Sequence, residues 1–348
     1  MASRKNLLDA ARKAGEVLSQ YKVRDRIAAG YTRIDPVEIA ENAGVAVMFQ
    51  RLDKLLGAFL RNDRPGIILN VARPPGLVHM TCAHELGHFF LNHDATADIE
   101  IEYGFSASTP ECQADQFAYS LLAPQWLVAH IAREKKWTAV ELKNPAIMYQ
   151  LSLRLGTSFS STAWTLERYG LIPDGTAAAI TSTCSPKAFK QQLLGNKTLD
   201  DWHPDVWLLD DADRRLVLEP HAADSFVVDL PSHITAGYSW SLDEATSEGF
   251  RLEPLLLDAT VTVPTLTIDR DMPVGQQNSI RCLLYRPPSD IEPIFRDRSS
   301  VSFVETQSWL GTRDTDDRYS FQTEYEMLAA GVSPLEKERL IAEAGDEA

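Results

Sequence analysis

Residues 77–93 read LVHMTCAHELGHFFLNH, and positions 84–88 within them form the pattern H-E-x-x-H. On an α-helix, residues four apart differ by about 40° around the axis, so His84 and His88 share one face. Two imidazole nitrogens on one face can hold a zinc ion, and Glu85 beside them can take a proton from a zinc-bound water. The apolar residues on both sides indicate that this helix is buried.

A second helix is predicted over PECQADQFAYSLLAP, residues 110–124, with Thr109 as its N-cap. A catalytic zinc site needs three protein ligands and one open position. Glu111 is our candidate for the third ligand. Asp115, one turn later on the same face, is a candidate acceptor for the free N–H of a zinc-binding histidine. The alternative is an exposed acidic pair in a first helical turn.

Other polar residues near the motif carry weaker predictions. His93 lies five residues after His88, about 140° around a continued helix, so we expect it to face away from the metal. Cys82 is expected to be a packing residue. The group that stabilises the oxyanion is not fixed by the sequence, and Tyr103, Tyr119 and His130 are the candidates.

The residues before the motif predict helices and a small sheet. Residues 2–29 have helical periodicity and an excess of basic side chains. Residues 35–44 predict a short capped helix and 45–49 a strand, while 55–60 and 66–70 predict a hairpin. A sheet beside a zinc helix suits a peptidase, because an edge strand can bind an extended substrate through its main chain.

Composition limits the classes of function. The 348-residue chain has 44% hydrophobic and 24% charged residues and a net charge of −15, as soluble globular proteins do. The chain lacks a membrane-length apolar run and a signal-peptide core, so we expect a cytoplasmic protein. Its four cysteines have neither the spacing of a disulfide framework nor that of a zinc knuckle, so we expect reduced thiols. The half after residue 173 has 15 basic and 31 acidic side chains, which disfavours direct nucleic-acid binding.

The second half predicts a different architecture. TAAAITSTCSPKAF, residues 176–189, is expected to be a linker, and short alternating apolar runs from about Trp202 predict a β-sandwich. We therefore predict an α+β protein, with a helical zinc-peptidase domain followed by an all-β domain. The expected parts are an N-terminal helix (1–30), the peptidase domain (31–175), the β domain (200–295) and a polar tail with a C-terminal helix (296–348).

Residues 34–173 resemble the ImmA/IrrE family of zincin-like zinc metallopeptidases. Four segments carry the resemblance in order: IDPVEIAENAGVAVMF, LLGAFLRNDRPGIILN, CAHELGHFFLNH and ECQADQFAYSLLAP. The resemblance implies Zn²⁺ held by His84, His88 and Glu111, with Glu85 as catalytic base. Gln113 departs from the pattern, since the family usually has an acidic residue there. Ala123 departs as well, where methionine is usual.

The resemblance also implies a substrate. Family members are typically cytosolic and cleave helix-turn-helix repressors of the XRE type, which releases stress or mobile-element genes. Two alternatives remain open: a toxin paired with an XRE-type antitoxin, and a zinc-containing regulator that acts by binding a partner without proteolysis.

Two stretches of the second half, LPSHITAGYSWSL (230–242) and IRCLLYRPP (280–288), resemble motifs of chagasin-type cysteine-protease inhibitors, which are immunoglobulin-like domains. The first stretch departs from the inhibitor pattern at Ser-His-Ile-Thr-Ala-Gly, and Pro288 replaces its final aromatic residue. A ligand- or substrate-binding module is therefore the expected role of this domain.

Overall fold

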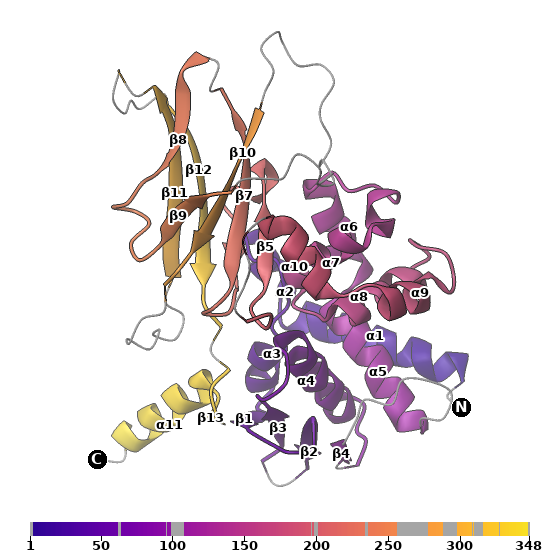
Figure 1. Ribbon diagram of the computed structural model, residues 1–348. Helices are drawn as coiled ribbons and strands as arrows, with labels where there is room; N and C mark the ends of the chain where they lie inside the picture. Colours follow the sequence, from indigo (N-terminus) through magenta and orange to yellow (C-terminus); the bar gives the residue numbers. More distant parts are fainter. Residues whose placement is uncertain are drawn as a thin grey trace. The chain divides into compact units, whose positions relative to one another are not determined.

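The computed structural model describes residues 3–61, 64–94, 96–98, 108–195, 197, 201–233, 236–255, 278–287, 298–307, 309, 316–326 and 328–346. The chain divides into two compact units. The first contains Met1–Ile131, Leu151–Thr181 and Leu328–Ala348, and the second contains Ala132–Gln150 and Ser182–Met327. The architecture is mixed α and β, with helices and small sheets (Figure 1).

The first unit contains the predicted motif helix and the small sheet. Its elements up to the start of the second unit are α1 (Arg4–Gln20), α2 (Val23–Ala28), α3 (Pro36–Asn42), β1 (Ala46–Gln50), β2 (Gly57–Leu60), β3 (Gly66–Asn70), α4 (Pro75–Phe90), β4 (Thr96–Asp98), α5 (Thr109–Leu122) and α6 (Gln125–Glu134). Later elements that contribute to it are α7 (Pro145–Leu155), α8 (Phe159–Arg168), α9 (Thr176–Thr183), β13 (Gly331–Val332) and α11 (Pro334–Asp346).

Local sequence accounts for several of these elements. The Asp35 carboxylate accepts hydrogen bonds from the backbone N–H groups of Val37 and Glu38, at 2.9 and 3.1 Å, so α3 begins at the predicted N-cap. Gly44, with φ of 79°, follows the end of that helix. For α5 the cap is Ser108 and not Thr109, because the Ser108 hydroxyl accepts from the N–H of Glu111.

The sheet of the first unit has the order β13-β1-β3-β2-β4. β2 and β3 pair antiparallel, with Ala58 opposite Ile68, so the predicted hairpin is confirmed. β1 lies parallel to β3, and β4 pairs antiparallel with β2 at one end of the sheet. Helix α4 contacts β2 and β3. Its residues 78–88 are all buried, as expected of a helix that is covered on every side.

The C-terminal segment belongs to the first unit. β13 pairs antiparallel with β1, with Met48 opposite Val332, and Figure 1 shows the yellow C-terminal segment beside the indigo strand β1. At the start of α11, the Arg64 guanidinium donates to both oxygens of Glu336 at 2.6 Å. The chain therefore returns to the first unit after completing the second.

The second unit contains two four-stranded sheets, with orders β5-β7-β10-β9 and β6-β12-β11-β8. Its elements are η1 (Glu141–Lys143), α10 (Pro186–Leu194), β5 (Val206–Leu209), η2 (Asp211–Asp213), β6 (Val217–Leu218), β7 (Ser225–Ser232), β8 (Tyr238–Leu242), β9 (Arg251–Pro254), β10 (Asn278–Tyr285), β11 (Arg298–Gln307) and β12 (Asp317–Glu324). The rings of Phe226 and Phe321 join the two sheets, with centroids 5.6 Å apart. Each sheet includes one parallel pair, β5–β7 and β6–β12. The immunoglobulin-like assignment stays a prediction.

Two expectations for the second half need correction. The expected linker is largely helical, because α9 and α10 cover most of residues 176–189. The expected polar tail is not a tail, because β11 and β12 are paired strands with buried residues such as Phe303 and Tyr319. In β12, polar residues alternate with the buried residues Tyr319, Phe321 and Thr323. In β11, residues 301–305 are all buried and include Ser302 and Glu305, so polar residues interrupt the apolar pattern. The C-terminal helix predicted within residues 296–348 is confirmed and spans Pro334–Asp346.

Among the residues that the structure describes, no helix is both long enough and apolar enough to span a membrane.

Candidate metal centre

Helix α4 places its two motif histidines with their Nε2 atoms together. The Nε2 atoms of His84 and His88 are 3.0 Å apart, and the ring centroids are 4.9 Å apart. Both side chains are almost fully buried, with exposed fractions of 3% and 0%. This is the arrangement that the four-residue spacing predicts for one helical face.

Helix α5 brings a carboxylate to the same point. Glu111 Oε2 lies 3.1 Å from His84 Nε2 and 3.6 Å from His88 Nε2. The two helices can approach this closely because Gly87 has no side chain. A Cβ at position 87 would lie 2.9 Å from the Cα of Ala114, so any other residue would force the helices apart.

The donor set fits a zinc ion. A tetrahedral zinc with ligand atoms at about 2.0–2.1 Å holds those atoms about 3.3 Å apart. The three separations here are 3.0, 3.1 and 3.6 Å. Two nitrogen lone pairs and a carboxylate oxygen facing one another require a proton or a cation between them. Among the described residues, His84, His88 and Glu111 form the one group of three or more such side chains that could hold a metal ion.

Each histidine has a partner on its other ring nitrogen. His84 Nδ1 lies 2.9 Å from Asp115 Oδ1. His88 Nδ1 lies 3.1 Å from His93 Nδ1, and the two rings meet edge to face. The expectation that His93 faces away was wrong, because α4 ends at Phe90 and Asn92 has a left-handed φ of 58°. The chain turns back there, so the helical angle no longer applies.

Glu85 lies beside this group without joining it, and it is fully buried. Strand β2 leaves space for it through Gly57. A Cβ at position 57 would lie 3.2 Å from Glu85 Oε1 and 2.5 Å from Thr81 Cγ2. A side chain on β2 at this point would therefore displace the carboxylate that the motif supplies.

The electrostatics favour an ionised ligand carboxylate. Hydrogen bonds from His84 and His88 hold the pKa of Glu111 well below its usual value. Burial, and then the neighbouring His88, lower the pKa of His93. Burial raises the pKa of the Cys82 thiol well above its usual value, which suits the packing role predicted for that residue. Glu111 is the most accessible of the three candidate ligands, with 24% of its side chain exposed.

The structure places two of the three oxyanion candidates, Tyr119 on α5 and His130 on α6. Tyr119 lies eight residues after Glu111, about 12 Å along the α5 axis. Its ring packs against the Arg168 guanidinium at 3.7 Å. His130 is on α6 and is not part of the metal-binding group. Tyr103 lies outside the described residues.

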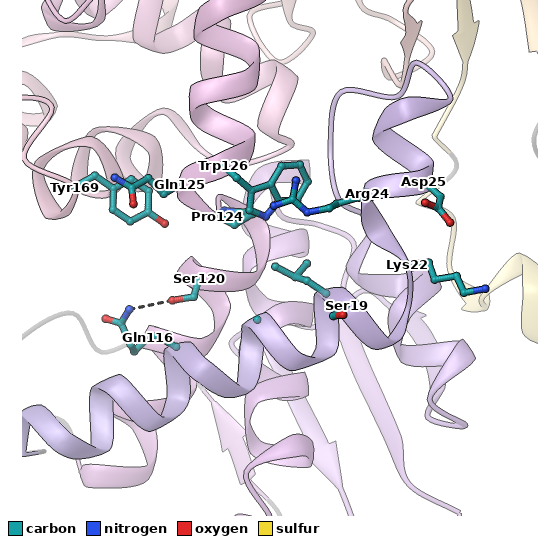
Figure 2. Close-up of a pocket in the computed structure, with 13 residues that line it drawn as sticks. Ser19, Lys22, Arg24, Asp25, Gln116, Ser120, Pro124, Gln125, Trp126 and Tyr169 are labelled. Carbon is teal, nitrogen blue, oxygen red and sulfur yellow. Dashed lines mark hydrogen bonds between the residues drawn. The ribbon is translucent and has the colours of Figure 1, made fainter.

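A separate groove of about 670 Å³ lies among α1, α2, α5 and α6 in the first unit (Figure 2). In it, the Arg24 guanidinium lies 4.2 Å from the centre of the Trp126 ring. Gln116 donates to Ser120 at 3.0 Å. The lining contains none of the three candidate metal ligands, although Gln116 and Ser120 share α5 with Glu111.

Sequence reasoning missed two contributors to the site. The contact of His93 could have been found from the end of the helix, since Asn92 is a residue type that adopts positive φ and ends helices. For Gly57 the one sequence signal is a glycine inside a predicted strand. A glycine in that position suggests that another part of the protein approaches the strand closely.

A search of curated proteins gives no match to this chain. Two solved structures are similar over 35% of the chain. One is the cysteine protease inhibitor EhICP2 from Entamoeba histolytica, with 10% identity, 95% of its own chain covered and a TM-score of 0.24. The other is amebosin, with 15% identity, 99% covered and a TM-score of 0.25. At these TM-scores neither likeness assigns a fold or an activity.

The family comparison covers the part of the chain that holds the metal-binding group. Residues 40–167 match the model of the Peptidase_M78 family, the IrrE N-terminal-like domain, so this segment is similar to a peptidase-family domain.

Proposed function

We propose that the first unit is a zinc-dependent endopeptidase. His84, His88 and Glu111 are its metal ligands, and Glu85 is its general base. The observation that carries the proposal is the convergence of two histidine Nε2 atoms and one carboxylate oxygen, from α4 and α5, beside a buried glutamate. The match of residues 40–167 to a metallopeptidase family supports it independently of the geometry.

The protein groups divide the chemistry of peptide hydrolysis among them. A zinc ion at this site would polarise the scissile carbonyl and lower the pKa of a bound water to about 7. Glu85 takes the proton of the attacking water and later delivers it to the leaving amine. Asp115 accepts the Nδ1–H of His84, which fixes that ring with its Nε2 toward the metal position.

The sheet suggests how a substrate is held. β4 is the end strand of the sheet, next to β2, and Gly57 of β2 borders Glu85. An extended peptide could add to the outer edge of β4, with β4 between it and the strand that borders the general base. This mode of binding requires the substrate to present an extended, accessible segment.

The proposed substrate is a helix-turn-helix repressor of the XRE type, whose cleavage would switch on stress or mobile-element genes. The resemblance of residues 34–173 to ImmA/IrrE peptidases supports this substrate class. A repressor substrate would place the reaction in the cytoplasm.

For the second unit we propose an immunoglobulin-like module that binds a ligand or the substrate. Its two sheets, with an aromatic contact between them, support this proposal.

Co-expression with helix-turn-helix repressors from the source genome tests the function. The wild-type chain is expected to produce a defined repressor fragment, identified by mass spectrometry, and Glu85→Gln is expected to retain zinc but produce no fragment. Glu16→Gln, which makes the same charge change at an exposed position of α1, is the control and should cleave normally. Equal cleavage by wild type and Glu85→Gln would rule out the proposed mechanism.

A further inference from the structure

The candidate metal ligands of α4 have different partners on their Nδ1 atoms. His84 faces a carboxylate, Asp115, whereas His88 faces another imidazole, with 3.1 Å between the Nδ1 atoms of His88 and His93. A histidine that binds a metal through Nε2 carries its proton on Nδ1 and needs an acceptor for it. For His88, the structure offers His93 in that place.

The position of residue 93 does not depend on its side chain. Its backbone N–H donates to the carbonyl of His88 at 2.9 Å. Arg61, just after β2, donates from Nε to the carbonyl of His93 at 3.1 Å and from Nη2 to the carbonyl of His88 at 3.4 Å. These backbone contacts hold the turn after α4 in place, so the side chain at position 93 can be changed with the turn retained.

Gln113, two residues after Glu111 on α5, lies close enough to the His93 ring to raise its pKa. An amide can either donate to or accept from a neutral imidazole, because it has both an N–H and a carbonyl oxygen. A neutral ring beside Gln113 can therefore still offer the lone pair of its Nδ1 to His88.

A charge count favours a neutral partner here. Glu111, Asp115 and the general base Glu85 together carry three negative charges, which already exceed the charge of one divalent cation. A carboxylate in the place of His93 would add a fourth negative charge next to His88, which is fully buried. An imidazole accepts the same N–H without that charge.

We propose that His93 is a positioning residue of the metal centre: its neutral ring accepts the Nδ1–H of His88 and so directs His88 Nε2 at the metal. This rests on the metal ligands given under the proposed function. It adds a residue outside H-E-x-x-H to the zinc site. Outer partners of zinc histidines typically change metal affinity by about 10- to 100-fold when removed.

Two substitutions separate hydrogen bonding from packing. His93→Asn keeps an acceptor oxygen on a smaller side chain, and His93→Phe keeps a ring of similar size without an acceptor. Zinc dissociation constants of the full-length variants are measured by competition with a chromophoric chelator, at one fixed pH. Absorption spectra of the cobalt-loaded proteins then report the geometry at the metal. His203→Ala, which removes a histidine whose side chain is 92% exposed, is the control for adventitious zinc binding.

We expect His93→Phe to weaken zinc binding by about 10- to 100-fold and to alter the cobalt spectrum, with His93→Asn closer to wild type. The reverse order, or affinities within twofold of wild type for both variants, would overturn the role of His93. A wild-type chain that binds zinc tightly but cleaves no repressor would contradict the proposed function and leave the test of His93 intact. A wild-type chain that binds no zinc would overturn both.

Discussion

The carboxylate of Asp115 lies 2.9 Å from Nδ1 of His84, so α5 contacts the same histidine twice. Glu111 reaches its Nε2 and Asp115, one turn later, reaches its Nδ1. A rotation of α5 about its own axis would move both carboxylates away from His84 together. The pairing of α4 with α5 therefore determines the geometry of the candidate metal centre.

Removing the Asp115 carboxylate should weaken zinc binding. We expect Asp115→Ala to raise the zinc dissociation constant about 10- to 100-fold. Asp115→Asn should have a smaller effect, because the amide oxygen can still accept the Nδ1–H of His84. Chelator competition measures both, with Gln116→Ala as the control, since Gln116 lines the separate groove. Equal dissociation constants for all three variants would contradict this role.

The residues of the site that helical spacing brings together could be predicted from the sequence. Those that depend on where a helix ends, or on tertiary packing, could not. His84, His88, Glu111 and Asp115 follow from two helices with four-residue spacings. His93 required knowing that α4 ends at Phe90. The strand β11 was hidden because serine and glutamate occupy two of its five consecutive buried positions, 301–305, which interrupts the apolar run.

Stability of the second unit should depend on the protonation of Asp224. Burial, followed by repulsion from Asp205, raises the pKa of Asp224 to about 6. The carboxylate accepts from the backbone N–H of Asp205 and from the Trp207 indole, at 2.7 and 3.1 Å. Because the folded state binds this proton more tightly than the unfolded state, stability rises as pH falls from above 6 toward 4. A shift of this size corresponds to about 3 kcal/mol.

Hydrogen exchange of the β7 amides measures this dependence within the second unit. Wild-type protection should increase on acidification from pH about 7 to about 5, after correction for intrinsic exchange rates. Asp224→Asn should be less stable, because its NH₂ would face the Trp207 indole N–H or a backbone N–H, and should lack the increase. A wild-type profile that is flat, or that falls toward low pH, would contradict the raised pKa.

The C-terminal segment should stabilise the first unit. Ending the chain after residue 327 removes β13 and exposes the β1 edge, so the amide of Phe49, opposite Gly331, should exchange faster and the protein should aggregate more readily. Glu336→Gln tests the ion pair with Arg64 alone. We expect a loss of about 1 kcal/mol, since Arg64 is partly exposed to solvent. Glu338→Gln, at an exposed position of α11, is the control.

Gly57 should be required for the placement of Glu85. Gly57→Ala would press a methyl group against Thr81 Cγ2 and crowd the Glu85 carboxylate, at a cost of about 1–3 kcal/mol and with reduced cleavage. Thr81→Ser removes the Cγ2 methyl and keeps the hydroxyl that donates to the Leu77 carbonyl. The double variant should therefore recover part of the lost stability and activity. Effects that simply add would show that the two positions do not interact.

Gly87 gives two opposite expectations, and the packing of α4 against α5 decides between them. Helix propensity alone predicts that Gly87→Ala stabilises the protein by about 1 kcal/mol. The new Cβ would instead meet the backbone of Ala114, which a side-chain rotation cannot relieve. We therefore expect Gly87→Ala to destabilise the first unit. It should also weaken zinc binding, because α5 would move away and carry Glu111 with it.

Gly15→Ala in α1 is the matched control, since nothing lies within 4 Å of a Cβ there, and it should be stabilising. If both alanines stabilise the protein and zinc affinity is unchanged, the close contact between α4 and α5 does not set the position of Glu111.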